Sequence, residues 1–283
     1  MGYSVGLVPL FYLFLQYTKE SQSMRMLLSL CVVLICTLPV WSQTVGDGEP
    51  DIIYDRQQLG GFNLNLNGFG IFYNYLKYKD AKHLRLYNID INFVKHEKET
   101  RTPSIYQDPQ VKSYIYGKQN NFYTMRLGMG QKVVLTEKLR KGGVQLGYLW
   151  QSGAVLGFTK PIYLQVVYVR QTPESEDYFI QVEKFDADRH FAENIYGRAS
   201  GLRGLGEMKF YPGIYFKSAL YFEFSNYKDG LKGIETGVSA DAFLQTIPIM
   251  SPKVLERDMS NPRNHQVFLG LYINFFLGGK ENI

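Results

Sequence analysis

The chain has 283 residues, 45% of them hydrophobic and 15% aromatic, and 31 Lys and Arg residues against 26 Asp and Glu residues give a net charge of +5. This length suits one large all-β domain or two smaller domains. Basic residues are interspersed with acidic ones, so no nucleic-acid partner is expected, whereas the 22 Tyr and 19 Phe suit strands that meet a membrane interface.

Residues 1–42 are predicted to be an export signal. A short basic segment around Arg25 precedes the apolar core 27–40, and small residues occupy the cleavage positions before Gln43. The earlier apolar run 5–17 is either a leader extension or an upstream segment from a start codon placed too early. A pair of membrane helices is the alternative, and it is disfavoured because both runs are shorter than the ~20 residues that span a bilayer.

Both cysteines, Cys31 and Cys36, lie within this predicted signal. A mature chain that begins at Gln43 then contains no cysteine, which excludes disulfides, thiol catalysis and cysteine-ligated zinc. Residues 43–58 form a polar leader, and residues 59–283 are predicted to form a single barrel domain.

After the leader, eight segments alternate apolar and polar residues with a period of two, as strands do. They lie near 62–78, 83–95, 122–134, 144–156, 161–169, 212–225, 233–244 and 265–278. Most have the nine or more residues that a tilted membrane-crossing strand needs, and eight is the smallest even number typical of outer-membrane barrels. The predicted fold class is all-β: an antiparallel, up-and-down transmembrane β-barrel of about eight strands.

Long loops are predicted after strands two, five and seven, at 96–120, 170–211 and 245–264. If both termini face the periplasm, the connections after odd-numbered strands face outward and should be the long ones. The loop 96–120 breaks this rule. Either it is a long periplasmic turn or one strand has been miscounted, and the sequence leaves both interpretations open.

Five short motifs carry a resemblance to one group of membrane proteins. They are Asn67-Gly68-Phe69-Gly70, Lys-His-Glu-Lys-Glu at 95–99, Tyr-Gly-Lys-Gln-Asn at 116–120, Lys160-Pro161 and Leu-Gly-Leu-Tyr-Ile-Asn at 269–274. In these motifs, and over most of its mature length, the chain resembles the outer-membrane β-barrel proteins of Bacteroidota. The resemblance implies an exported protein in the outer membrane of a Gram-negative cell. Some barrels of this kind serve a gliding- and secretion-linked export system, and others have no assigned role.

The polar faces of the predicted strands carry charged residues, namely Asp90, Arg126, Lys217, Glu223, Glu235 and Asp241. The interior of an eight-stranded barrel is just wide enough for side chains to fill it, and an isolated buried ion is very costly. We therefore predict that these charges pair and plug the lumen. A proton- or ligand-binding role for the same groups is the alternative, and an open pore is not expected.

The four histidines, His83, His96, His190 and His265, lack zinc-ligand spacing, so neither a metal nor a cofactor is predicted. His265 opens the last strand and Asp241 ends the preceding one, which makes His265 a candidate rim site. A lipid hydrolase would need a serine beside such a pair, and Ser239 and Ser260 are near in sequence. Nothing fixes their geometry, and no catalytic residue is assigned.

Three functional hypotheses follow. The first is a non-enzymatic barrel among outer-membrane lipids, an accessory or scaffold component of protein export or envelope transport that meets its partners through loops 170–211 and 245–264. The second is an outer-membrane lipid-modifying enzyme, and the third is a soluble periplasmic barrel like a lipocalin. A soluble barrel turns its apolar face inward. The charged faces here also carry small residues such as Gly128 and Gly147, which suits a crowded interior and favours the membrane.

Overall fold

The computed structural model describes residues 55–106, 108, 111–136, 143–171, 176–224, 230–252 and 263–281. The predicted export signal and residues 43–54 of the leader lie outside these ranges. Within them, no helix has the length and apolar character needed to cross a membrane.

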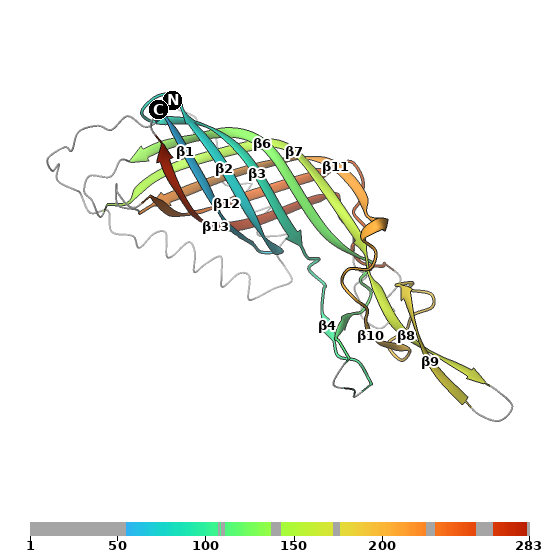
Figure 1. The fold of residues 1–283 in the computed structure, drawn as a ribbon. Helices are drawn as coiled ribbons and strands as arrows, with labels where there is room; N and C mark the ends of the chain where they lie inside the picture. Colours follow the sequence, from blue (N-terminus) through green and yellow to red (C-terminus); the bar gives the residue numbers. More distant parts are fainter. Residues whose placement is uncertain are drawn as a thin grey trace, which may run out of the picture. The chain divides into compact units, whose positions relative to one another are not determined.

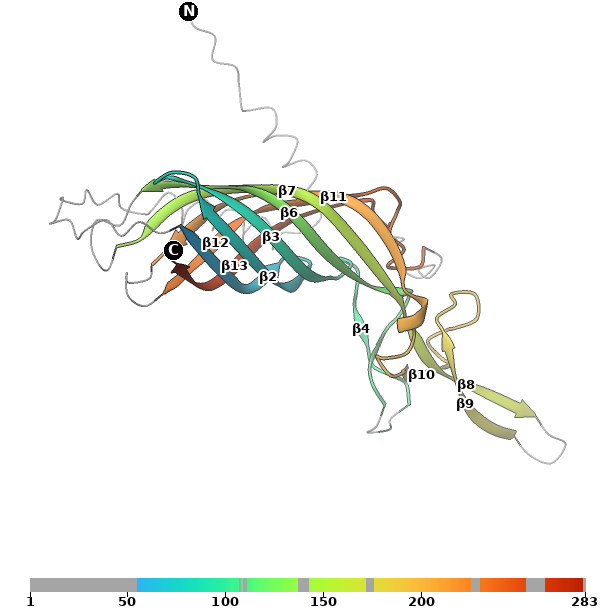
Figure 2. The same cartoon turned by 45° about the horizontal axis from the view of Figure 1, so that its top comes forward.

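In the described part of the chain, eight antiparallel strands close into a barrel (Figures 1 and 2). Around the ring they are β1 (Arg56–Asn65), β13 (Val267–Glu281), β12 (Leu231–Phe243), β11 (Lys209–Glu223), β7 (Gln145–Pro161), β6 (Asn120–Thr136), β3 (His83–Val94) and β2 (Gly68–Tyr78). β1 pairs with β2 on one side and with β13 on the other, which closes the ring. The predicted all-β, antiparallel, up-and-down barrel of eight strands is confirmed.

The predicted strand 62–78 is wrong, because it is two strands. β1 ends at Asn65 and β2 begins at Gly68, and these two residues are partners across a two-residue turn. The turn shifts the alternation by one residue: the outward side chains include Phe62 and Leu64 in β1 but Phe69 and Ile71 in β2, and such a shift within one strand also fits a bulge. The other mark of the turn in the sequence is the dipeptide Asn67-Gly68, of which Asn67 is the second turn residue and Gly68 the first residue of β2.

The predicted barrel strand 161–169 is also wrong. β7 continues to Pro161, and β8 (Tyr163–Gln171) leaves the barrel to pair with β9 (Glu176–Lys184) and β10 (Ile195–Arg198). Its alternation instead serves a separate small core of Tyr114, Leu164, Val166, Phe185 and Ile195. The prediction merges two barrel strands and adds one that is not in the barrel, so its count of eight is right although two of its strands are wrong.

The corrected strand order places the long connections, 95–119, 162–208 and 244–266, at one end of the barrel (Figure 1). We call this the loop end, which also holds the two-residue turn 66–67, and we call the other, with Arg56 and Glu281, the turn end. The long loop assigned to follow strand two therefore follows the third barrel strand. The predicted exception disappears, because the long connections now follow the third, fifth and seventh barrel strands, while the first is followed by the two-residue turn 66–67.

The barrel interior has three layers, which β3 displays in order. From the turn end to the loop end its inward side chains are Leu84, Leu86, Asn88, Asp90, Asn92 and Val94. An apolar cluster of Leu59, Phe72, Leu76, Leu149, Leu231 and Phe276, among others, fills the turn end. A second cluster fills the loop end, where Ile247, Ile249 and Met250 of the connection after β12 fold back into the mouth. The polar layer lies between them.

The outer face of the barrel is apolar and exposed. Large side chains on it include Phe62, Leu64, Ile71, Ile91, Leu127, Ile214, Val238, Leu269, Leu271 and Phe275. A protein surrounded by water rarely exposes a continuous apolar surface of this extent. The apolar side faces outward and the charges face inward, which is the arrangement of a barrel in lipid and the reverse of a lipocalin-like barrel.

Close packing inside the barrel depends on Gly147, and its replacement by alanine is expected to destabilise the fold by about 1–3 kcal/mol. Gly147 is the cross-strand partner of Tyr221, and a Cβ atom added there would lie 2.1 Å from the Tyr221 ring. Urea unfolding in detergent micelles would measure the loss. Gly270→Ala is the matched control, because its Cβ would meet the Ser239 hydroxyl at an ordinary 3.7 Å. Equal losses in both variants would contradict the packing argument.

Candidate functional site

Two ion pairs form the centre of the polar layer. The ammonium group of Lys217, on β11, binds the carboxylate of Asp90, on β3. Arg126, on β6, makes a bidentate contact with Asp241, on β12, at 2.8 and 2.6 Å. Arg126 also approaches Asp90 to 3.5 Å, so Asp90 is shared between two cations. All four side chains are buried, and the network joins four strands across the lumen.

Glu235 lies beside this network and is held by neutral donors. Its Oε1 atom accepts hydrogen bonds from the Tyr272 hydroxyl at 2.6 Å and from the Asn274 amide at 3.1 Å. The ammonium of Lys217 lies 4.8 Å above the Tyr272 ring, which ties the two groups together. Tyr272 and Asn274 were missed as network members, although the alternation of the last strand already placed them on its polar face.

Glu223 belongs to a second cluster, nearer the turn end. Its carboxylate is 3.9 Å from the Lys132 ammonium and 3.7 Å from that of Lys280. Lys132 also lies 3.9 Å above the ring of Tyr221. Of the six charged residues singled out in the sequence, the structure thus brings four into one network, places Glu235 next to it and separates Glu223. Lys132 and Lys280 were not anticipated as partners.

The chemistry open to these groups is limited. The central cations have carboxylate partners, the central carboxylates have cationic or hydrogen-bonding partners, and an apolar cluster separates the layer from each end of the barrel. Buried charges held this way are costly to disturb and present no free nucleophile to a substrate. Among the described residues, no group of three or more His, Cys, Asp or Glu side chains is placed to hold a metal ion.

The structure does not bring His265 and Asp241 together. Asp241 points into the lumen and binds Arg126, because inward and outward positions alternate along β12. His265 precedes β13 at the rim, where its ring stacks on that of His96 with 6.0 Å between centroids. The hydroxyl of Ser239 donates to the Gly270 carbonyl, and Ser260 lies outside the described residues. No catalytic triad forms from the described members of this predicted site.

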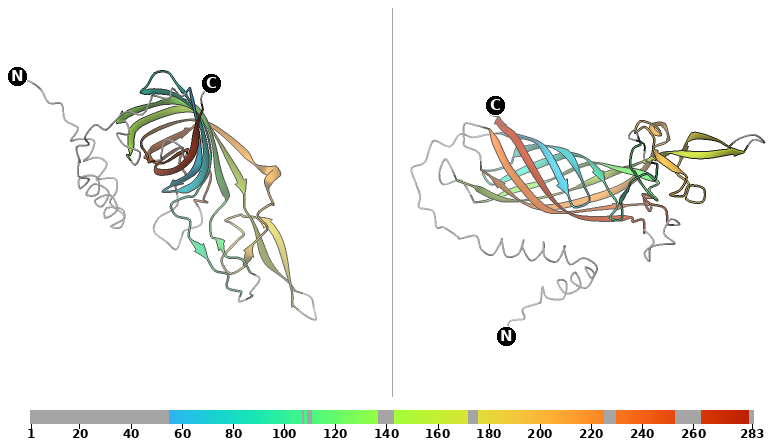
Figure 3. Two further views of the ribbon diagram at one scale, coloured as in Figure 1. Left: turned by 60° about the vertical axis from the view of Figure 1, so that its left-hand side comes forward. Right: turned by 90° about the horizontal axis from the view of Figure 1, so that it is seen from below.

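The loop end carries a folded extension. The described strands there form a sheet in the order β10-β8-β9 and a short pair, β4 (Arg101–Thr102) with β5 (Tyr114–Ile115), and Figure 3 shows the β8–β9 hairpin continuing outward from the barrel. A one-turn 3-10 helix, η1 (Leu205–Glu207), leads into β11. β9 pairs with β8 alone among the described strands, and its Tyr178, Phe179 and Ile180 are exposed. Its outer side is therefore an open sheet edge.

Comparison with known proteins adds little to this geometry. No protein-family model matches the chain, and no curated protein matches it in sequence. Among solved structures, the chain is similar to Ail, the attachment invasion locus protein of Yersinia pestis, with a TM-score of 0.34 and 8% identity over 80% of this chain and 99% of that chain. A likeness this low carries no functional argument. The class of the protein, a closed eight-stranded antiparallel barrel with an apolar outer face, rests on its own structure, and membership of the Bacteroidota barrels stays a prediction.

Proposed function

We propose that the chain is an integral outer-membrane barrel without enzymatic activity, an accessory or scaffold component of protein export or envelope transport that works through its folded loop end. The observation that carries the proposal is the contrast between the two parts of the molecule. The lumen is filled and sealed, whereas the extension presents an ordered sheet with an open edge.

Two features support the membrane location. The outer face exposes large apolar side chains on strands all around the ring, and this surface suits acyl chains. The three long connections share one end of the barrel, and the other end has only shorter connections, as in outer-membrane barrels, whose short turns face the periplasm. The loop end is then the extracellular side.

The filled lumen argues against a pore. Apolar side chains occupy both ends, and the ion pairs Lys217–Asp90 and Arg126–Asp241 cross the middle. A conducting barrel needs a continuous polar path, and small barrels of eight strands are usually packed solid. The same enclosure keeps these charged groups away from any substrate, which supports a role without catalysis.

The open edge of β9 supports a binding role. Exposed backbone donors and acceptors on an edge strand recruit another strand by β-augmentation, and neighbouring apolar side chains add specificity. The sheet within the predicted loop 170–211 supplies this edge. The other predicted surface is loop 245–264. Its residues Ile247, Ile249 and Met250 pack into the barrel mouth, and its residues 253–262 lie outside the described ranges. We therefore place the partner surface on β9.

The test uses the full chain with an affinity tag, expressed in cells and crosslinked before solubilisation. Fractionation should place the folded, heat-modifiable barrel in the outer membrane. The double variant Tyr178→Lys and Ile180→Lys should lose at least about tenfold of any envelope protein that crosslinks to the native chain, because two charges oppose strand addition. Leu202→Lys, also exposed at the loop end but outside the sheet, should retain it. Recovery of the protein in the soluble periplasm, or equal crosslinking by all three chains, would reject the proposal.

A further inference from the structure

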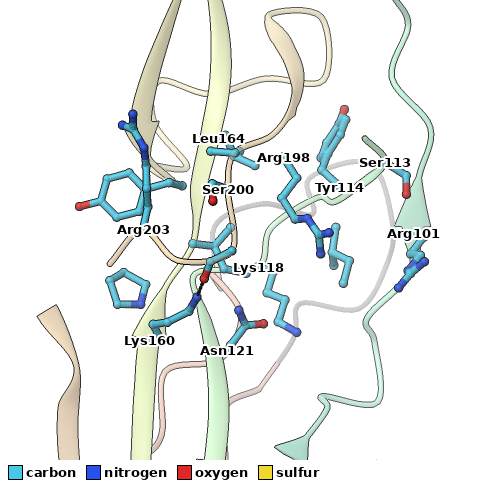
Figure 4. Close-up of a pocket in the computed structure, with 16 residues that line it drawn as sticks. Arg101, Ser113, Tyr114, Lys118, Asn121, Lys160, Leu164, Arg198, Ser200 and Arg203 are labelled. Atoms are coloured by element: carbon cyan, nitrogen blue, oxygen red, sulfur yellow. Dashed lines mark hydrogen bonds between the residues drawn. The ribbon is translucent and has the colours of Figure 1, made fainter. Parts of the chain in front are cut away.

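A small basic pocket lies at the loop end, where β7 leaves the barrel wall and β8 begins (Figure 4). Its cavity measures about 80 Å³ and is lined by β4, β5, the ends of β6 and β7, and the segment 198–203. Five basic residues line it: Arg101, Lys118, Lys160, Arg198 and Arg203. Arg203 directs its guanidinium away from the other four in Figure 4, so the argument rests on those four.

These cations outnumber their counter-ions. Lys118 is buried and pairs with Glu99 at 2.5 Å. Lys160, only 6% exposed, donates to the backbone carbonyl of Gly201, and no carboxylate of the described residues contacts it. The side chains of Arg101 and Arg198 likewise have no ion pair within the described part of the chain. Four cations therefore face one carboxylate.

Arg198 also repels both lysines of the pocket. Burial lowers the pKa of the Lys118 ammonium, the contact with Glu99 opposes this shift, and the charges of Lys95 and Arg198 add to it. Arg198 repels the ammonium of Lys160 as well. Burying a charged group without a counter-ion is strongly unfavourable, and grouping several such cations increases the cost. A bound anion would remove both penalties.

The geometry selects the kind of anion. Lys118 and Lys160 are buried, whereas Arg101 and Arg198 are exposed, and Ser200 and Asn121 add neutral polar groups to the lining (Figure 4). Guanidinium forks match phosphate oxygens in pairs, and lysines supply compact point charges. The cavity has room for one tetrahedral oxyanion. A net excess of three positive charges favours a dianion over a carboxylate.

We propose that this pocket binds a phosphate group, presented as free phosphate or as a phosphomonoester on a lipid of the surrounding leaflet. The two sources share one chemistry. The phosphate site does not depend on the partner surface of β9, because no residue of that strand lines the pocket.

Binding is tested on the full purified chain in zwitterionic detergent micelles, with inorganic phosphate as the probe and chloride added to keep ionic strength constant. The native chain should bind phosphate, and Arg198→Gln with Lys160→Gln should weaken binding at least tenfold. Arg170→Gln is the matched control, because Arg170 lies over the ring of Phe179 in the same extension but outside the pocket. Its affinity should stay within about twofold of native. Absence of phosphate binding to the native chain and to lipid phosphate, or equal affinity of all variants, would overturn the proposal.

A second measurement guards against a variant that misfolds. Without phosphate, Arg198→Gln should unfold at the same or a higher temperature than the native chain, since one repelling charge is gone. With phosphate, the native chain should gain stability and the variant should not, because only a bound ligand shifts the native equilibrium. Equal gains in both would overturn the site.

A third experiment, with lipid vesicles, identifies the source of the phosphate group. The chain is inserted into phosphatidylcholine vesicles with and without lipid A carrying its phosphate groups. Displacement of bound inorganic phosphate by lipid A would assign the site to a lipid headgroup. Phosphate binding that lipid A leaves unchanged would assign it to free phosphate. Either result upholds a phosphate site at Arg198 and Lys160.

Discussion

Asp90→Leu should lower the free energy of unfolding by about 3–5 kcal/mol, the usual effect of removing one partner from a buried ion pair. Asp90 is shared between Lys217 and Arg126, and its loss leaves the fully buried Lys217 ammonium without its carboxylate. Arg126 keeps Asp241, so the damage is concentrated on Lys217. Urea unfolding in lipid vesicles, followed by the mobility of the folded barrel in gels, would measure the change.

The matching double variant separates charge from shape. Asp90→Leu combined with Lys217→Met removes both charges and keeps apolar volume, so it should recover most of the stability lost in the single variant. Asp90→Asn, which retains a polar side chain of similar size, should fall between native and Asp90→Leu. A double variant as unstable as the single one would show that Asp90 and Lys217 are not coupled through their charges.

Leu127→Arg should destabilise the inserted barrel by about 2–4 kcal/mol, the cost of an arginine on the lipid face near the middle of the membrane. Leu127 follows Arg126 on β6, so it stands on the outer face at the depth of the central ion pairs, and it is 49% exposed. The comparison uses unfolding in vesicles and the fraction of chain that inserts. An arginine on the surface of a soluble barrel would cost almost nothing.

Leu202→Arg provides the control for this variant. Leu202 is 76% exposed, in the segment between β10 and η1 at the loop end, outside the barrel wall. Its replacement should change stability by less than about 0.5 kcal/mol, as surface substitutions usually do. If Leu127→Arg were equally harmless, the apolar outer face would not be in contact with lipid.

The sequence correctly predicted features that depend on residues close together in the chain, such as which side chains of a strand face inward. Alternation along single strands placed Asp90, Arg126, Lys217 and Asp241 on inward faces, and the structure has them there. Alternation changes phase at the turn Leu66-Asn67, but a phase change fits a bulge as well as a turn, so alternation alone cannot separate β1 from β2. It also cannot say which core a strand covers, and for that reason β8 was assigned to the barrel although its buried residues pack on Tyr114 and Ile195.

The sequence alone could not predict which distant residues pair with each other. Arg126 and Asp241 are 115 positions apart, and their contact depends on the register and closure of the whole ring. The basic pocket is harder still, because Arg101, Lys118, Lys160 and Arg198 come from separate segments and no local motif joins them. His265 and Asp241 were expected to meet because they lie at the adjoining ends of neighbouring strands, but strand ends do not reveal which way a side chain points, and Asp241 faces the lumen and binds Arg126.

The pairing of β1 with β13 has a consequence for how the protein is made. Arg56 lies opposite Glu281, so the seam joins the first barrel strand to be synthesised with the last. Until Val267–Glu281 has emerged, β1 and β12 are both unpaired edges, and such edges invite association with other chains. The chain must therefore be made through β13 before the ring can close, and until that moment it needs protection from aggregation.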